Sequence, residues 1–126
     1  MSIETNLETQ QLNSTVAELP IVVIQREGRW MKLPTGRFVD MKAHRVLGGI
    51  VRKLAEERIV SPSIPVPPQR LVESGWPGEN IQPKAAKNRL HVALSTLRKM
   101  GLQDALITTP AGYMLNPALT MRVEAA

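Results

Sequence analysis

The chain has 126 residues, and its 16 Lys and Arg against 11 Asp and Glu give a formal net charge of +5. This length fits one domain, and a hydrophobic fraction of 43% is enough for a core and argues against a wholly disordered chain. The absence of cysteine excludes a disulfide scaffold, a thiolate zinc site and a cysteine nucleophile.

The N-terminal part of the chain divides into a polar segment and a small sheet. Residues 1–20 are polar and show no helical stripe, so we expect a flexible leader there. Extended runs at 21–24, 30–33 and 37–39 are separated by turn residues that include Gly28 and Gly36. This pattern predicts a small antiparallel sheet of about three strands.

An amphipathic helix is predicted after this sheet. Asp40 is a suitable N-cap, because its carboxylate can accept from the amides of a first turn, and the helix should run to about Arg58. Apolar residues recur at helical spacing at Ala43, Leu47, Ile50, Val51 and Leu54. Gly48 and Gly49 lie inside this helix at a cost of about 1 kcal/mol each relative to alanine. The glycine pair therefore predicts that another backbone packs closely against the helix, with a functional hinge as the less favoured alternative.

Two further helices are expected to begin at prolines, which suit the first helical position. The first runs from Pro68 to about residue 74 and is stopped by Gly75. The second runs over 83–100 and is ended by Gly101. Its buried face consists of Ala86, Leu90, Ala93, Leu94 and Leu97.

The C-terminal part predicts a β-hairpin. Short extended pieces at 106–109 and 113–115 flank the turn residues Pro110, Ala111 and Gly112. Residues 118–126 are expected to form a short tail that frays.

This element order, three helices and a closing hairpin, is that of a winged helix-turn-helix domain. Residues 88–102 (NRLHVALSTLRKMGL) and 107–115 (ITTPAGYML) resemble the effector domain of OmpR-type response regulators and the related winged domain of bacterial pathway activators. Leu71 followed by Trp76 resembles the end of the family's second helix. The resemblance implies an α+β winged helix-turn-helix domain over 21–117, with an N-terminal small antiparallel sheet, a three-helix core and a C-terminal β-hairpin wing.

The resemblance also implies a function. In this family the helix that corresponds to 83–100 lies in the DNA major groove, the hairpin at 106–115 is the wing, and the loop at 75–82 can contact RNA polymerase. We therefore expect sequence-specific duplex-DNA binding in transcriptional regulation. RNA polymerase or a separate sensor protein is a candidate partner, and a homodimer is a candidate assembly.

The charge distribution agrees with a polyanionic partner. Residues 80–102 contain five basic residues and no acidic one, whereas residues 1–20 contain three glutamates and no base. Such a segment favours nucleic acid, although a solvated helix face is the commoner explanation of a few lysines.

The candidate DNA-binding residues lie on the long helix, opposite its leucines, and on the hairpin. They are Lys84, Lys87, Asn88, Arg89, Val92, Ser95, Thr96, Arg98, Lys99, Thr108 and Thr109. Asn88 can pair with adenine and Arg89 with guanine, while the lysines near the helix ends suit phosphates. Glu79 and Asn80 are expected to face a protein partner, because Glu79 would repel phosphate.

A rival interpretation is a winged-helix module for protein–protein contact without strong DNA binding. Asn88, Ser95 and Thr96 stand where several family members have arginines, and the hairpin carries no basic residue. Salt-dependent binding to random duplex DNA would distinguish the two. An RNA-binding module is disfavoured, because four aromatic residues offer little for stacking on splayed bases.

Other function classes find no support in the sequence. No glycine-rich phosphate loop, nucleophile elbow or metal-spaced cluster is present, so we expect no catalysis, no cofactor and no metal. No apolar run approaches the roughly 20 residues of a membrane helix, and the polar N-terminus does not resemble a secretory signal. We therefore expect a cytoplasmic protein that does not contact a membrane.

Overall fold

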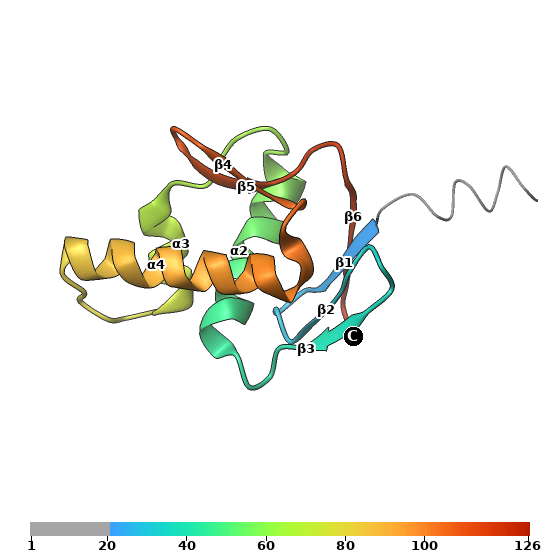
Figure 1. Cartoon of the computed structure of the whole chain (residues 1–126), viewed down its shortest axis with the longest axis horizontal. Helices are drawn as coiled ribbons and strands as arrows, with labels where there is room; N and C mark the ends of the chain where they lie inside the picture. Colours follow the sequence, from blue (N-terminus) through green and yellow to red (C-terminus); the bar gives the residue numbers. More distant parts are fainter. Residues whose placement is uncertain (1–20) are drawn as a thin grey trace, which may run out of the picture.

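The computed structural model describes residues 21–126, so the leader predicted at 1–20 lies outside the described residues. The strands and helices, in chain order, are β1 (Ile21–Gln25), β2 (Trp30–Lys32), β3 (Phe38–Asp40), α2 (Arg45–Val60), α3 (Pro68–Gly75), α4 (Pro83–Leu97), η1 (Arg98–Leu102), β4 (Leu106–Thr109), β5 (Gly112–Leu115) and β6 (Thr120–Glu124). Over the described range the fold is α+β, with three α-helices, a four-stranded mixed sheet and a separate hairpin (Figure 1).

The four-stranded sheet joins both ends of the described chain. β1, β2 and β3 form the predicted antiparallel meander, with Met31 opposite both Ile24 and Val39. The strand order is β3-β2-β1-β6, and β6 runs parallel to β1 from Thr120 to Glu124. The predicted three antiparallel strands are therefore present, but the fourth, parallel strand was not predicted, and the prediction of a fraying tail at 118–126 is wrong. Only two apolar residues alternate in this strand, which is too short a pattern to identify it from the sequence.

Helix α2 is the central helix, and its predicted apolar face is buried except for Ala43, which is exposed in the turn before the helix. Leu47, Ile50, Val51 and Leu54 all lie in the core. The predicted N-cap is wrong, because Asp40 belongs to β3 and its carboxylate accepts from the backbone N–H of Lys42 at 2.9 Å. A turn that follows the buried Met41 separates the strand from the helix, and His44 then precedes α2 without a side-chain cap.

The glycine pair in α2 lies where two other segments approach the helix. A methyl group added at Gly48 would overlap the backbone carbonyl of Gly28, in the turn between β1 and β2. A methyl group added at Gly49 would overlap the carbonyl oxygen of Ser74, in α3. The close approach predicted from the two glycines is thus confirmed, on both sides of the helix.

Helices α3 and α4 begin at the predicted prolines, and Figure 1 shows α4 crossing the front of the molecule. Leu90, Leu94 and Leu97 are each 1% exposed or less, as their spacing predicts. The α-helix ends at Leu97, and the π-helical turn η1 continues to Leu102. Gly101, within η1, has φ +134 and packs against the side chain of Leu33.

The hairpin of β4 and β5 forms at the predicted place and lies above α4 in Figure 1. A backbone bridge joins it to the segment before α3. The N–H of Val66 donates to the carbonyl of Tyr113 at 2.7 Å, and the N–H of Tyr113 donates back at 3.0 Å. The hairpin is therefore held to the helical part of the fold by regular hydrogen bonds rather than hanging free.

Candidate nucleic-acid interface

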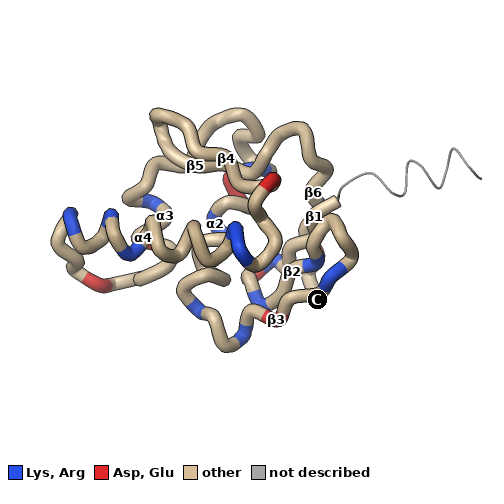
Figure 2. Tube along the Cα trace, viewed as in Figure 1, with Lys and Arg blue, Asp and Glu red and all other residues tan. Residues whose placement is uncertain are grey.

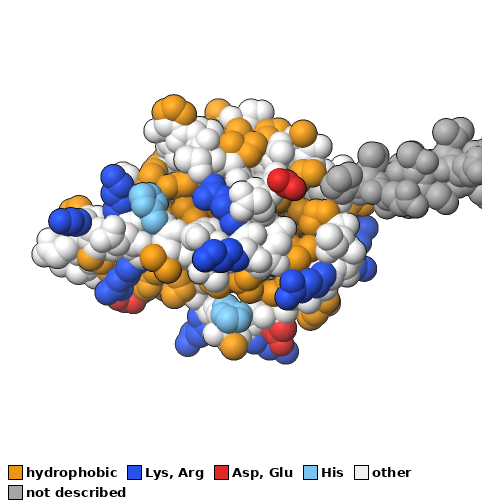
Figure 3. All heavy atoms as spheres, in the orientation of Figure 1, with side chains coloured by type: hydrophobic (Ala, Val, Ile, Leu, Met, Phe, Trp, Pro, Cys, Tyr) orange, Lys and Arg blue, Asp and Glu red, His pale blue; other side chains and the backbone are white. Residues whose placement is uncertain are grey.

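The exposed side of α4 and η1 presents one continuous row of side chains. Lys84, Asn88, Val92, Ser95 and Lys99 are all exposed, and their spacing of three or four residues places them along one line of the helix. We call this row the outward stripe. In Figure 2 the tube of α4 carries basic residues and no acidic one, and Figure 3 shows Lys and Arg spread over this face.

One predicted DNA-binding residue is paired with a predicted partner-binding residue. A guanidinium nitrogen of Arg89 lies 3.2 Å from a carboxylate oxygen of Glu79, and the two side chains are 47% and 53% exposed. The sequence predicts them in different sites, since they are ten residues apart and belong to a helix and a loop. An exposed pair of this kind contributes little stability, but it holds Arg89 against an acid.

Two predicted DNA-binding threonines already hold hydrogen bonds within the protein. The hydroxyl of Thr96 donates to the carbonyl of Val92 at 2.9 Å, one turn earlier in the same helix. The hydroxyl of Thr109 accepts from the backbone N–H groups of Ala111 and Gly112, which closes the hairpin turn. Their side-chain oxygens are therefore already engaged within the protein.

Arg98 and Thr108 connect the end of the long helix to the hairpin. The guanidinium of Arg98 donates to the hydroxyl of Thr108 at 2.7 Å and lies 3.4 Å from the carbonyl oxygen of Leu106. This contact fixes the first hairpin strand relative to the outward stripe. The structure thus brings Thr108 of the hairpin next to the end of the long helix. The hydroxyls of Thr108 and Thr109 are, however, already hydrogen-bonded within the protein.

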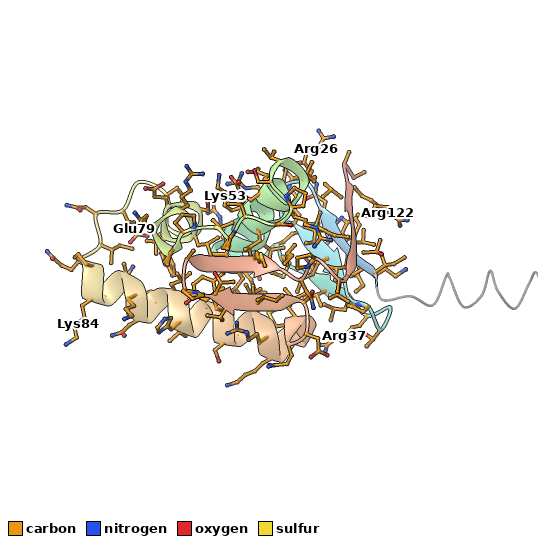
Figure 4. All side chains as sticks on the ribbon, turned by 90° about the horizontal axis from the view of Figure 1, so that it is seen from above. Arg26, Arg37, Lys53, Glu79, Lys84 and Arg122 are labelled. Atoms are coloured by element: carbon orange, nitrogen blue, oxygen red, sulfur yellow. The ribbon has the colours of Figure 1, made fainter. Side chains whose placement is uncertain are left out.

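Basic residues stand near both ends of the outward stripe. Lys84 and Lys87 lie in the first turns of α4, and Lys99 lies in η1. Arg37, which the sequence predicts in a strand and not among the DNA-binding residues, is exposed in the turn between β2 and β3. In Figure 4 it lies on the same side of the molecule as α4, whereas Arg26, Lys53 and Arg122 lie on the opposite side.

The loop at 76–82 leads directly into α4. Glu79 and Asn80 are exposed, as a partner-binding role requires, and the backbone N–H of Glu79 donates to the carbonyl of Trp76 at 3.2 Å. Trp76 is partly buried against the core and anchors the loop. The loop is longer than the 3–4-residue turn of the simplest helix-turn-helix motif.

An apolar groove runs beside the outward stripe. Its volume is about 480 Å³, and its apolar lining includes Val46 and Leu47 of α2, Trp76 of the loop and Val92 of α4. Arg89 lies at its polar border. The same side of α4 therefore offers hydrogen-bonding groups and an apolar surface next to each other.

Neither a metal-binding cluster nor a membrane-spanning helix is found between residues 21 and 126. No three His, Cys, Asp or Glu side chains gather there in a way that could hold a metal ion. None of the helices in that range is long and apolar enough to cross a membrane.

Comparisons of the chain with protein-family models, with curated proteins and with solved structures find no match.

Proposed function

We propose that this chain is a winged helix-turn-helix protein that binds duplex DNA in transcriptional regulation, with α4 as its recognition helix and the β4–β5 hairpin as its wing. One observation carries the proposal. The middle of the outward stripe consists of the uncharged side chains of Asn88, Val92 and Ser95, and basic residues stand at both of its ends. The resemblance to OmpR-type effector domains supports the same assignment.

The distribution of charge matches the shape of the major groove. An α-helix with its side chains is about 10–12 Å across, and the major groove is about 12 Å wide. Phosphates border the groove and base edges form its floor, so cations suit the ends of a recognition helix and neutral polar groups suit its centre. Lys84 and Lys99 are separated by about 22 Å along the helix axis, at 1.5 Å per residue.

The hairpin and the loop have separate roles in this proposal. The hairpin has no basic residue, so it contributes shape and backbone contacts more than charge. Arg98 holds it beside α4, and Val66 joins it to the segment before α3. The loop at 76–82 carries Glu79, which phosphate would repel. We propose that this loop faces a protein, either RNA polymerase or a separate sensor.

Salt titration of binding to random duplex DNA tests the proposal. Neutralising about four phosphates should give a slope of about −3.6 for the logarithm of the binding constant against the logarithm of salt concentration. The double variant Lys84→Ala/Lys99→Ala should weaken binding and flatten this slope by about 2. Its matched control is Arg26→Ala/Arg122→Ala, which removes the same charge on the opposite side of the molecule (Figure 4).

Two results would overturn the proposal. The first is no binding at roughly 50 mM salt, where phosphate contacts are strong. The second is an equal loss in both double variants, because overall charge rather than α4 would then account for the interaction.

A protein–protein module is the second candidate function, and the apolar groove beside α4 favours it. Val46, Trp76 and Val92 could receive an apolar side chain of a partner, with Arg89 at the border for an acidic neighbour. This candidate predicts no salt-dependent affinity for random duplex DNA. The titration described above therefore decides between the two functions.

A further inference from the structure

Val92 is an apolar side chain at the centre of a polar face. It is 67% exposed, whereas Leu90 and Leu94 on the buried side of the same helix are each 1% exposed. It has a hydrophilic neighbour one turn away in each direction of the outward stripe, Asn88 before it and Ser95 after it. Val92 adds nothing to the core, but it borders the apolar groove lined by Val46 and Trp76, so it offers an apolar contact surface beside the polar groups of the stripe.

Two polar side chains next to Val92 have their polar groups bound within the protein. The hydroxyl of Thr96 donates to the carbonyl of Val92, so this threonine offers its methyl group rather than its hydroxyl to a ligand. Arg89, the side chain here that could read guanine, is paired with Glu79 at 3.2 Å. The middle of the stripe therefore has apolar contact groups, the amide of Asn88 and the hydroxyl of Ser95, and no unpaired cation among the described residues.

These groups complement an A·T base pair. In the major groove thymine presents a C5-methyl group, which apolar side chains contact, and adenine presents N7 and the N6 amino group, which an asparagine amide can bind with two hydrogen bonds. Asn88 and Val92 are one helical turn apart, about 6 Å, which corresponds to about two base-pair steps of 3.4 Å. Both can therefore contact the floor of one groove within a few base pairs.

We propose that Val92 contacts the C5-methyl group of a thymine while Asn88 binds an adenine, so that the centre of the preferred DNA site consists of A·T base pairs. This inference rests on the proposed function, and it adds the class of DNA sequence and the two side chains that select it. Lys84 and Lys99 supply affinity for phosphate without selecting a base.

The contact with thymine can be tested by removing a single methyl group from the DNA. A duplex pool with a random core is prepared twice, once with thymine and once with deoxyuridine, which keeps the base-pairing pattern and lacks the C5-methyl group. Wild-type protein should bind the deoxyuridine pool about fourfold more weakly, as expected when one methyl-sized apolar contact is lost. The variant Val92→Ala lacks the two terminal methyl groups of valine and should lose most of this difference.

The matched control is Val60→Ala. Val60 is 77% exposed at the end of α2, so this variant makes the same chemical change at an exposed helical valine away from α4. It should keep the full preference for thymine. Far-UV circular dichroism and thermal unfolding should show both variants folded, because alanine is the better helix former and neither valine is buried.

The contact with adenine is tested in the same way with 7-deazaadenine, which lacks the N7 acceptor. Wild-type protein should lose affinity for this pool, and Asn88→Ala should not distinguish it from the adenine pool. DNA binding without any dependence on the thymine methyl group, or a dependence that persists undiminished in Val92→Ala, overturns this inference and leaves the proposed function standing. Absence of binding to every pool overturns both.

Discussion

Arg89 and Glu79 are the residues whose interpretation changes most between sequence and structure. By itself, Arg89 on an acid-free helix suits a guanine base, and Glu79 in the preceding loop suits a protein partner. Their separation of 3.2 Å makes them one unit, in which the acid competes with DNA for the guanidinium. A protein that draws Glu79 away would release Arg89 for DNA, so the two proposed surfaces are coupled through this contact.

Substitution of Glu79 by Gln should therefore strengthen DNA binding. The change removes one carboxylate near the phosphates and releases Arg89, and an exposed pair of this kind corresponds to at most about a fivefold change in affinity. The control is Glu124→Gln, because Glu124 pairs with Arg122 in β6, on the opposite side of the molecule from α4. Fluorescence anisotropy with a labelled duplex measures both, and weaker binding by Glu79→Gln would place the carboxylate in the DNA interface.

At the scale of single elements, α2 packs directly against the backbone of two other segments. Its glycines bring the turn after β1 and the end of α3 closer than any side chain would allow. The position of α3 in turn fixes the loop at 76–82 and the start of α4. The two glycines therefore contribute to the placement of the candidate interface, although neither touches it.

Replacement of Gly49 by Ala should destabilise the protein, although helix propensity alone predicts the opposite. Alanine would gain about 1 kcal/mol in an open helix. Here its methyl group would overlap the carbonyl oxygen of Ser74, and overpacking of this kind costs about 1–3 kcal/mol or more. Urea unfolding followed by circular dichroism measures the difference in the free energy of unfolding. The control is Ser95→Ala on the exposed face of α4, which should be neutral or slightly stabilising. A higher midpoint for Gly49→Ala would mean that α3 can move away at no cost.

At the scale of the whole molecule, the C-terminal segment closes the fold. β6 pairs with β1, the amide of Gln25 donates to the carbonyl of Ala125 at 3.1 Å, and Leu119 packs against the core. Arg58, at the end of α2, holds the chain on its way to this strand. Its guanidinium donates to the carbonyl of Asn116 at 2.9 Å and to that of Leu119 at 2.6 Å.

Substitution of Arg58 by Met should lower the free energy of unfolding by about 1.5–3 kcal/mol, because two carbonyl groups lose charged hydrogen-bond donors. Arg52→Met is the control on the same helix. Arg52 forms an exposed pair with Glu56 one turn away, so its loss should cost less than about 0.5 kcal/mol. Equal effects of the two variants in urea unfolding would mean that the segment after β5 is held without Arg58.

Local sequence patterns were sufficient to predict most helices and strands, and to predict which residues of α4 face outward. Helical periodicity, prolines at helix starts and glycines at helix ends predicted α2, α3 and α4, and two short extended runs around turn residues predicted the hairpin. The residues that make up each of these signals lie close together in the sequence, so the signals can be recognised without the tertiary structure. The exposure of Lys84, Asn88, Val92 and Ser95 follows from the same periodicity, since burial of the leucines on one side turns these residues outward.

Contacts between distant segments were decided only by the tertiary structure. The parallel pairing of β6 with β1 joins residues about a hundred positions apart, and a short strand becomes stable only where another strand edge and a core receive it. The start of α2 likewise depends on β3 and the buried Met41 rather than on an N-cap residue. The pairing of Arg89 with Glu79, and of Arg98 with Thr108, depends on how a loop and a hairpin fold back onto α4. Sequence periodicity therefore determined which side chains face outward, and packing between elements determined which of them are already bound within the protein.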